Sequence, residues 1–238
     1  MKELTTMMLL SATMLSFISC KKEVVGEGPV VTQERPVTNF TAIDLRMAGD
    51  VYYKQDANRK LEIIAQQNIL DMLETYVSDN KLVIKFNGGS DYHSSDQVRI
   101  NISGPDVNRF GLTTSGSIHC INNLELAGLS LNITGSGSIS LMQVATHNIE
   151  AINNGSGNIT AIGGSADTEN LKTSGSGKID LVNISAKNIT AKIAGSGSIK
   201  VKAADHLDAT VEGSGSIYFT GYPAVSSHIY GTGHLIHF

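Results

Sequence analysis

The chain has 238 residues, of which 41% are hydrophobic and 17% are charged, and its formal net charge at pH 7 is -4. This is the composition of a folded globular protein, because disordered chains carry fewer apolar residues and a larger net charge. The mild acidity provides no basic surface for a phosphate backbone, so we expect no nucleic acid among the partners.

The first residues have the features of an export signal, and we assign residues 1–19 to a lipoprotein signal peptide. Lys2 supplies a positive charge, the apolar stretch from Met7 to Ile18 follows, and Ser19 and Cys20 end the segment. The apolar stretch is too short to span a bilayer permanently. A small residue followed by Cys resembles a bacterial lipobox, where cleavage exposes a Cys that is then acylated. The alternative is an ordinary signal peptide that happens to contain a Cys.

Lipidation of Cys20 would place the protein at the bacterial cell envelope, on an outer-membrane, periplasmic or surface face. Two or three acyl chains on one Cys exceed the single chain that gives only marginal membrane binding. Residues 20–29 would then be the lipidated Cys and a polar tether containing Gly and Pro. Cys120 is the second of the two cysteines. It lies in the inward phase of a strand pattern, which predicts a buried and unreactive thiol.

We expect residues 30–238 to form a single domain, whose first part is the less regular one. A strand-Gly-strand pattern surrounds Gly49, and further strand patterns occupy residues 61–65, 82–86 and 98–102. Residues 68–76 have the apolar spacing of a short helix, which we expect to cap the N-terminal end of the domain. The polar residues 87–95 are predicted to form a loop.

From residue 110 onwards a Gly-X-Gly unit or its equivalent returns at a nearly constant interval. The second Gly of each unit stands at positions 116, 137, 157, 177, 197, 215 and 233, in steps of 18 to 21 residues. A fixed period near twenty indicates a solenoid. Around each unit apolar and polar residues alternate strictly, as in Ile193, Gly195, Gly197 and Ile199. Such alternation is typical of a β-strand.

The predicted fold is therefore all-β, a right-handed parallel β-helix or solenoid with about seven Gly-Ser-Gly coils. An N-terminal β region with one short capping helix precedes the coils. One coil would consist of two strand segments and a looser third side, and the stacked coils would share one apolar core. A propeller or sandwich requires hairpin turns and reversing strands. The in-phase run through each corner argues against these alternatives.

Glycines fall in the inward phase where two strands meet, so we predict a corner without room for an inward side chain. The predicted structural glycines are Gly116, Gly135, Gly137, Gly155, Gly157, Gly175, Gly177, Gly195, Gly197, Gly213, Gly215, Gly231 and Gly233. The outward residues at the same corners form a possible binding ladder of Ser136, Ser156, Ser176, Ser196, Ser214 and Thr232. A solubilising edge is the alternative interpretation of this ladder. Asn153 and Thr173 occupy inward positions of consecutive coils, where we expect them to hydrogen-bond to each other.

Carbohydrate-active enzymes built on a β-helix need clustered carboxylates or a stacked base. The acidic residues of the repeats are scattered and do not recur as matched pairs at one-coil spacing: Glu125, Glu150, Asp167, Glu169, Asp180, Asp205, Asp208 and Glu212. Residues 175–179 lack the first Gly and the final Ser or Thr of a phosphate-binding loop. His228, His234 and His237 have no nearby Cys or carboxylate to complete a metal site. We therefore predict no catalytic residue, no cofactor and no metal.

The repeated Gly-Ser-Gly-Ser-Ile units resemble those of a bacterial family, the putative auto-transporter adhesin, head GIN domain family. The opening residues 26–30, Arg35 and residues 40–43, and the closing residues 218–223, share this resemblance, which extends over about residues 26–238. It implies an exported or lipid-anchored β-solenoid protein of the Bacteroidetes type, and it brings no catalytic residues. Together with the lipid anchor and the exposed ladder, it predicts a non-enzymatic adhesion or binding module with glycans or envelope proteins as partners. The alternatives are a carbohydrate-active β-helix enzyme and a purely structural envelope spacer.

Overall fold

The computed structural model describes residues 23–87, 91–93 and 97–238. These residues form a β-solenoid with one short helix, α1 (Gln67–Leu70). No helix among them is long and apolar enough to cross a membrane. The strands are β1 (Glu23–Val25), β2 (Val30–Glu34), β3 (Ala42–Leu45), β4 (Asp50–Gln55), β5 (Lys60–Gln66), β6 (Leu73–Ser78), β7 (Lys81–Phe86), β8 (Asp91–His93), β9 (Arg99–Gly104), β10 (Arg109–Leu112), β11 (Ser117–Ile133), β12 (Ser138–Asn153), β13 (Asn158–Thr173), β14 (Lys178–Ile193), β15 (Ser198–Val211), β16 (Ser216–Thr220), β17 (Ala224–Ile229) and β18 (His234–His237).

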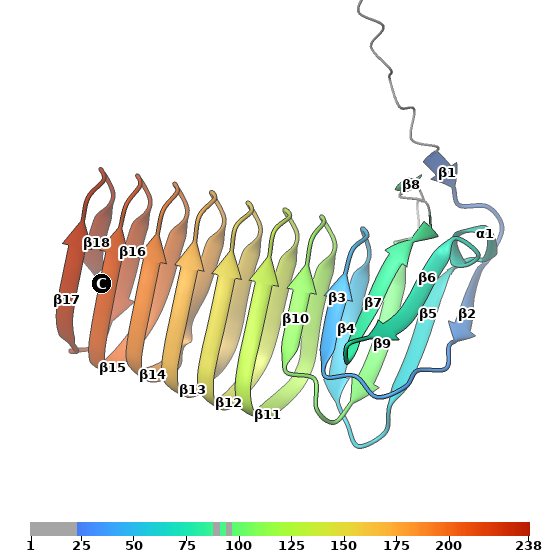
Figure 1. Cartoon of the computed structure of the whole chain (residues 1–238), viewed down its shortest axis with the longest axis horizontal. Helices are drawn as coiled ribbons and strands as arrows, with labels where there is room; N and C mark the ends of the chain where they lie inside the picture. Colours follow the sequence, from blue (N-terminus) through green and yellow to red (C-terminus); the bar gives the residue numbers. More distant parts are fainter. Residues whose placement is uncertain (1–22, 88–90, 94–96) are drawn as a thin grey trace, which may run out of the picture.

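The repeats stack as parallel coils, as the sequence predicts. Each of the strands β11 to β14 pairs in parallel with the strand that follows it. The front strands in Figure 1 run towards the narrow corners, and the chain returns behind them and advances towards the C-terminus with each turn. This path is right-handed, in agreement with the prediction.

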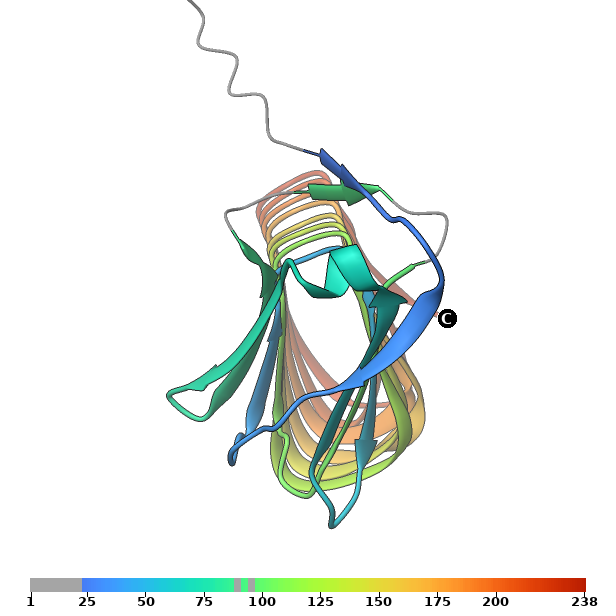
Figure 2. The same ribbon diagram turned by 90° about the vertical axis from the view of Figure 1, so that its right-hand side faces the viewer.

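The sides of a coil are more regular than expected. One continuous strand, such as β12, runs from one corner to the next, and its pairing with β13 skips only Met142 and His147. The side predicted to be looser is therefore strand as well, bent at these two positions. Viewed along the axis in Figure 2, a coil is narrow at the Gly-X-Gly corner and wide at the opposite bend.

The solenoid has about six turns, whereas the sequence predicts about seven. The difference arises because seven corner units have only six full turns between them. The corner between β3 and β4 belongs to the N-terminal region and not to these seven units, but it stacks on the first of them, since the amide of Ser117 donates to the carbonyl oxygen of Gly49. The pattern around Gly49 therefore continues the solenoid towards the N-terminus, as its sequence suggested.

The N-terminal region does not follow the chain order of the coils. β3 and β4 form one coil, and β7 and β9 form the coil beyond it, towards the N-terminal end. β10 then returns to the opposite side of β3. The coil of β3 and β4 therefore lies between two coils that come later in the sequence.

Antiparallel strands and helix α1 close this end of the solenoid. β5 pairs with β9 and β2, and β6 pairs with β7, all in antiparallel fashion. Ile69 and Leu70 of α1 are almost fully buried over the end of the core. The predicted capping helix is present but shorter than residues 68–76, because β6 begins at Leu73. The guanidinium of Arg35 holds this turn in place by donating to the carbonyl oxygens of Leu70 and Leu73.

Part of the segment expected to be a tether belongs to the folded region. β1 pairs in parallel with β8, and the amide of Glu27 donates to the side chain of Asn68. β8 lies within the predicted loop of residues 87–95, and residues 88–90, 94 and 95 of that loop lie outside the described residues. Residues 1–19 and Cys20 also lie outside them.

The interior is a continuous column of aliphatic side chains. Ile118, Ile139, Ile159, Ile179, Ile199 and Ile217 follow the corners of successive coils and are all fully buried. Each such Ile contributes about 1.5–3 kcal/mol through the hydrophobic effect. Cys120 is buried in the same column, as predicted, and burial raises the pKa of its thiol.

The two inward polar residues bond to the backbone rather than to each other's side chains. The amide of Asn153 donates to the carbonyl oxygen of Gly157 at 2.7 Å, and its oxygen accepts from the amide of Gly155 at 3.2 Å. The hydroxyl of Thr173 donates to the main-chain oxygen of Asn153 at 3.0 Å. Asn153 and Thr173 are therefore hydrogen-bonded to each other, as predicted, but through the main-chain oxygen of Asn153.

Candidate functional site

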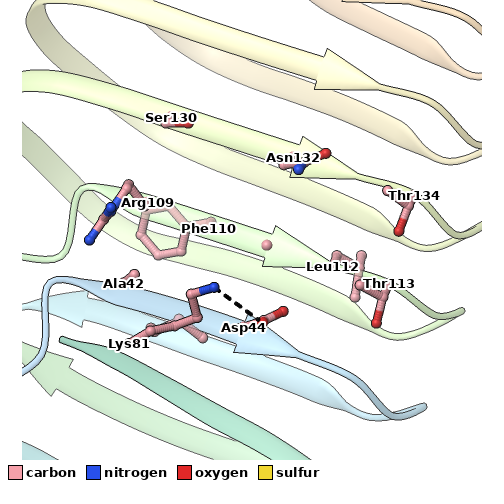
Figure 3. Close-up of a pocket in the computed structure, with 12 residues that line it drawn as sticks. Ala42, Asp44, Lys81, Arg109, Phe110, Leu112, Thr113, Ser130, Asn132 and Thr134 are labelled. Atoms are coloured by element: carbon pink, nitrogen blue, oxygen red, sulfur yellow. Dashed lines mark ion pairs between the residues drawn. The ribbon is translucent and has the colours of Figure 1, made fainter. Parts of the chain in front are cut away.

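A hollow of about 280 Å³ lies on the outer surface where the irregular N-terminal region meets the regular coils. Its floor and walls come from β3, β7, β10 and β11, together with the residues that follow β10 and β11. The hollow therefore lies over the pair formed by β10 and β3. Its outward-facing lining is polar: Asp44, Lys81, Arg109, Thr113, Ser130, Asn132 and Thr134 (Figure 3).

The hollow exists because two neighbouring outward positions carry small residues. Gly111 on β10 faces outward between the buried side chains of Phe110 and Leu112, and Ala42 on β3 is also small. A Cβ added at Gly111 would lie 3.3 Å from Oδ1 of Asp44, so the carboxylate occupies part of the space that a side chain would use. Gly111 thus keeps both the depth of the hollow and access to Asp44.

Asp44 is the charged group most deeply placed in the hollow, with 8% of its surface exposed. Its Oδ2 accepts from Nη2 of Arg46 at 2.7 Å and lies 3.7 Å from Nζ of Lys81. Arg109 projects from the neighbouring strand and its guanidinium contacts the hydroxyl of Thr41 at 3.3 Å. Arg46 and Lys81 therefore contact this carboxylate, and Arg109 adds a further positive charge to the lining of the hollow.

The opposite wall offers hydrogen-bonding groups without charge. Within the described residues, the side chains of Asn132 and Thr134 have no hydrogen-bond partner, and both are exposed. An amide and a hydroxyl can each donate and accept. Together with the cations, the hollow can bind a ligand that has several hydroxyls and an anionic group.

The predicted ladder lies elsewhere, along the narrow edge of the solenoid. Ser136, Ser156, Ser176, Ser196, Ser214 and Thr232 are all exposed at the tips of successive corners. The corners themselves form a row along the upper edge in Figure 1. The row is regular but convex, so a ligand on it would contact only the tips of these short side chains.

The predicted corner glycines lie beneath this row. A Cβ on Gly137, Gly157, Gly197 or Gly215 would collide with the carbonyl oxygen of the corner one coil earlier. The backbones of successive corners therefore lie close together along the solenoid axis. The sequence predicts only that the corner has no room for an inward side chain. The amides of the corner residues use this approach, since Ser198 donates to the oxygen of Gly177.

The acidic residues of the repeats do not converge among the described residues. Glu150 is in register with Asn170, and Asp208 with Thr190. Asp167 binds Lys187 and His147, each at 2.7 Å, which lowers the pKa of its carboxyl. These are surface contacts between coils.

The three histidines near the C-terminus take separate positions. The ring of His237 stacks on Phe219 and contacts the carbonyl oxygen of Gly221, while that of His228 stacks on Tyr230. His234 is exposed at the start of β18. No group of three or more potential metal-binding side chains occurs within the described ranges.

Sequence reasoning missed the hollow and the groups that make it. The one local signal is Gly111, an outward glycine within a strand pattern and outside the Gly-X-Gly units. Its pairing with Asp44 follows from the placement of β10 beside β3, which the order of the sequence does not indicate.

Similarity to known proteins agrees with this fold. The family model of the putative auto-transporter adhesin, head GIN domain, matches residues 39–223. The opening residues 26–35 of the sequence resemblance, and those after 223, lie outside this match. No curated protein is significantly similar to the chain.

Several solved structures have the same architecture. A putative adhesin from Bacteroides fragilis is 25% identical, with a TM-score of 0.86, over 90% of this chain and 100% of the other. A putative adhesin from Parabacteroides distasonis is 22% identical, with a TM-score of 0.75, over 91% and 100% of the two chains. A putative lipid binding protein from the same species is 25% identical, with a TM-score of 0.75 and the same coverage. Because the family match extends over most of its length, the chain belongs to the putative auto-transporter adhesin, head GIN domain family.

Proposed function

We propose that this protein is a non-enzymatic binding module of the bacterial cell envelope, which holds a glycan on the outer surface of its solenoid. The adhesin family and the likeness to adhesin structures support a role in binding. The separation of the acidic side chains supports a role without catalysis, since glycoside hydrolysis uses two carboxylates at a defined spacing.

The hollow at Gly111 is the observation that carries this proposal. Its volume of about 280 Å³ is close to the lower end of the range of small-ligand pockets, which begins at roughly 300 Å³. Lys81 and Arg109 suit an anionic group, and Asn132 and Thr134 suit hydroxyls. A sugar residue with a carboxylate has both kinds of group, so an acidic glycan is the ligand class that we propose.

The Ser and Thr ladder is a second candidate surface. Exposed faces of repeat proteins serve as extended binding surfaces, and many weak contacts in a row add through multivalency. An extended glycan or an envelope protein could use the ladder, whereas a single sugar residue would use the hollow.

Anchoring through Cys20 completes the proposal. An acylated Cys would hold the solenoid beside the membrane through the segment that precedes β1. The binding surface would then be presented at the envelope.

The experiment is a glycan and envelope-protein array probed with the wild-type protein and two variants. Gly111→Val fills the hollow, and the joint change of Ser136, Ser156, Ser176 and Ser196 to Lys alters the ladder. We expect acidic glycans to bind the wild type and the ladder variant but not Gly111→Val. Loss in the ladder variant alone would move the binding surface to the corners. Turnover of a polysaccharide would support the enzyme instead, and no ligand in either screen would favour the structural spacer.

A further inference from the structure

The two ends of the solenoid differ. At the N-terminal end α1 and the antiparallel strands cover the core. At the other end β17 pairs only with β15 and β18 only with β16, and no other strand of the described residues lies beyond them. The last coil therefore leaves one side of its backbone without a neighbouring strand (Figure 1).

Side chains that belong to the core are exposed at this open end. Val225 and Ile229 are in register with Leu207 and Val211 of the preceding coil. Their exposed fractions are 46% and 48%, against 1% and 0% for Leu207 and Val211. The same positions of the repeat are thus fully buried one coil earlier, and only a covering layer is missing. The rings of Tyr230 and Phe238 are also exposed at this end.

The backbone of the last coil is also open. The amide of Tyr230, the residue after β17, donates to the carbonyl oxygen of Val211 in β15, so the backbone groups of Tyr230 face β15. In a parallel ladder alternate residues point their backbone groups to opposite sides. The N–H and C=O groups of Val225, Ser227 and Ile229 consequently face away from β15. Such an edge is a template for pairing with a further strand.

Charged side chains, a common protection of edge strands, are absent at this end. Edge strands commonly carry Lys or other charged side chains that prevent pairing with a second chain. Residues 221–238 contain no Asp, Glu, Lys or Arg, although the whole chain has 18 basic and 22 acidic residues. Two copies of this end can therefore approach each other without repulsion between charged side chains.

We propose that the open C-terminal end docks on the same end of a second copy of this chain, about a two-fold axis. At the N-terminal end α1 and the antiparallel strands cover the core, so core side chains such as Ile69 and Leu70 are not exposed there for a second copy to contact. A two-fold axis makes the surface self-complementary and closes the assembly at two copies. β17 and β18 run in opposite directions on the two faces of the last coil. A two-fold axis therefore places each edge strand beside a strand of the second copy that runs the other way, so the strands would pair in antiparallel fashion.

The size of the end is consistent with a dimer. Stable interfaces involve roughly 20–30 residues on each side and bury about 800 Å² per partner. Residues 221–238 contribute 18 residues, and the rim of the preceding coil adds to them. Tyr and Phe are enriched in such interfaces.

The test is sedimentation velocity of the full-length protein in a mild detergent, over the micromolar concentration range. One variant carries Val225→Lys and Ile229→Lys, which places two charges at the open end. A second carries Ser227→Pro, which removes one edge N–H. The matched control carries Ile121→Lys and Ile162→Lys, because these apolar side chains are similarly exposed, at 47% and 70%, on the wide bend. Thermal melting verifies that every variant is folded.

We expect the wild type and the control to sediment as dimers. The double Lys variant should dimerise at least about 100-fold more weakly, and Ser227→Pro should weaken the dimer as well. A wild type that remains monomeric throughout the range would overturn the proposal. So would a dimer that only the control variant disrupts, or a wild type that forms filaments of increasing length.

Discussion

At the scale of single residues, the corner glycines determine how closely the coils stack. Each lies against the carbonyl oxygen of the preceding corner, and this contact repeats along the solenoid. Backbone atoms cannot move aside as the end of a flexible side chain can. A substituted corner must therefore separate two coils, and this breaks hydrogen bonds such as that from Ser198 to Gly177.

Gly197→Val should therefore destabilise the protein strongly. Its Cβ would collide with the oxygen of Gly177 and lie 3.2 Å from the hydroxyl of Thr173. We expect the free energy of unfolding to fall by about 3 kcal/mol or more. Chemical denaturation measures this change, with Ser196→Val at the exposed tip of the same corner as the control. An unchanged denaturation midpoint for Gly197→Val would show that the corner tolerates a side chain.

Glu169 is a carboxyl placed among apolar residues. It lies in register between Ile149 and Ile189, it is 2% exposed, and neither of its carboxyl oxygens has a hydrogen-bond partner among the described residues. Burial raises the pKa of Glu169 from 4.5 to about 8. A buried carboxyl of this kind favours the protonated form, because ionisation in an apolar interior is unfavourable.

The stability of the protein should depend on pH through this residue. Because the folded state holds the proton more tightly, the contribution of Glu169 is complete below pH 4.5 and is lost as the pH rises towards 8. We expect wild type and Glu169→Gln to have similar stabilities near pH 4.5. Near pH 8 the wild type should be less stable than the variant by several kcal/mol, because a tenfold change in proton affinity corresponds to about 1.4 kcal/mol.

Denaturation curves of both proteins between pH 4 and pH 9 measure this difference, and subtracting one from the other removes the effects of all other groups. A difference that does not change with pH would mean that Glu169 titrates normally. Glu169→Leu provides a second comparison, since Leu suits the aliphatic neighbours on both adjacent coils.

At the scale of elements, the two ends of the solenoid should respond differently to the loss of an aliphatic side chain. Ile69 of α1 is fully buried, whereas Ile229 of β17 is 48% exposed. We expect Ile69→Ala to lower the free energy of unfolding by about 2–4 kcal/mol. Ile229→Ala should have a much smaller effect in the monomer. Thermal melting at low protein concentration compares them, and equal losses would contradict the assignment of α1 as the cap.

The elements also show which features can be read from the sequence. The period of about twenty residues and the alternation of apolar residues predict the parallel coils, since both are local properties that repeat. The burial of Cys120 follows from the same alternation. The shortening of α1 could not be predicted, because the apolar residues of β6 continue the helical spacing past Leu70.

The hollow could not be predicted, because it depends on contacts between distant parts of the chain. Gly111 meets Asp44 only because β10 is inserted on the far side of β3. Asn132 and Thr134 come from the next coil. A pattern within one strand carries no information on such neighbours, whereas the ladder of Ser and Thr is visible because every member belongs to the same repeat.

At the scale of the whole molecule, the lipid anchor and the solenoid should act as separable parts. If Cys20 carries the lipid, Cys20→Ala should move the protein from the membrane fraction to the soluble fraction. Cell fractionation with immunoblotting measures this distribution, and Cys120→Ala is the control because that thiol is buried in the core. Retention of Cys20→Ala in the membrane fraction would contradict lipid anchoring at this residue.

The central claim is that the outer surface of the solenoid binds a glycan in the hollow at Gly111. The most direct test is a calorimetric titration of the acidic glycan that binds best on the array. Gly128→Val is the matched control, because Gly128 is a partly exposed β11 residue whose added Cβ would meet only the oxygen of Asn148, at 3.9 Å. We predict that Gly111→Val weakens binding at least about tenfold, or 1.4 kcal/mol, while Gly128→Val binds as the wild type does. Unchanged affinity in a folded Gly111→Val variant would contradict the account.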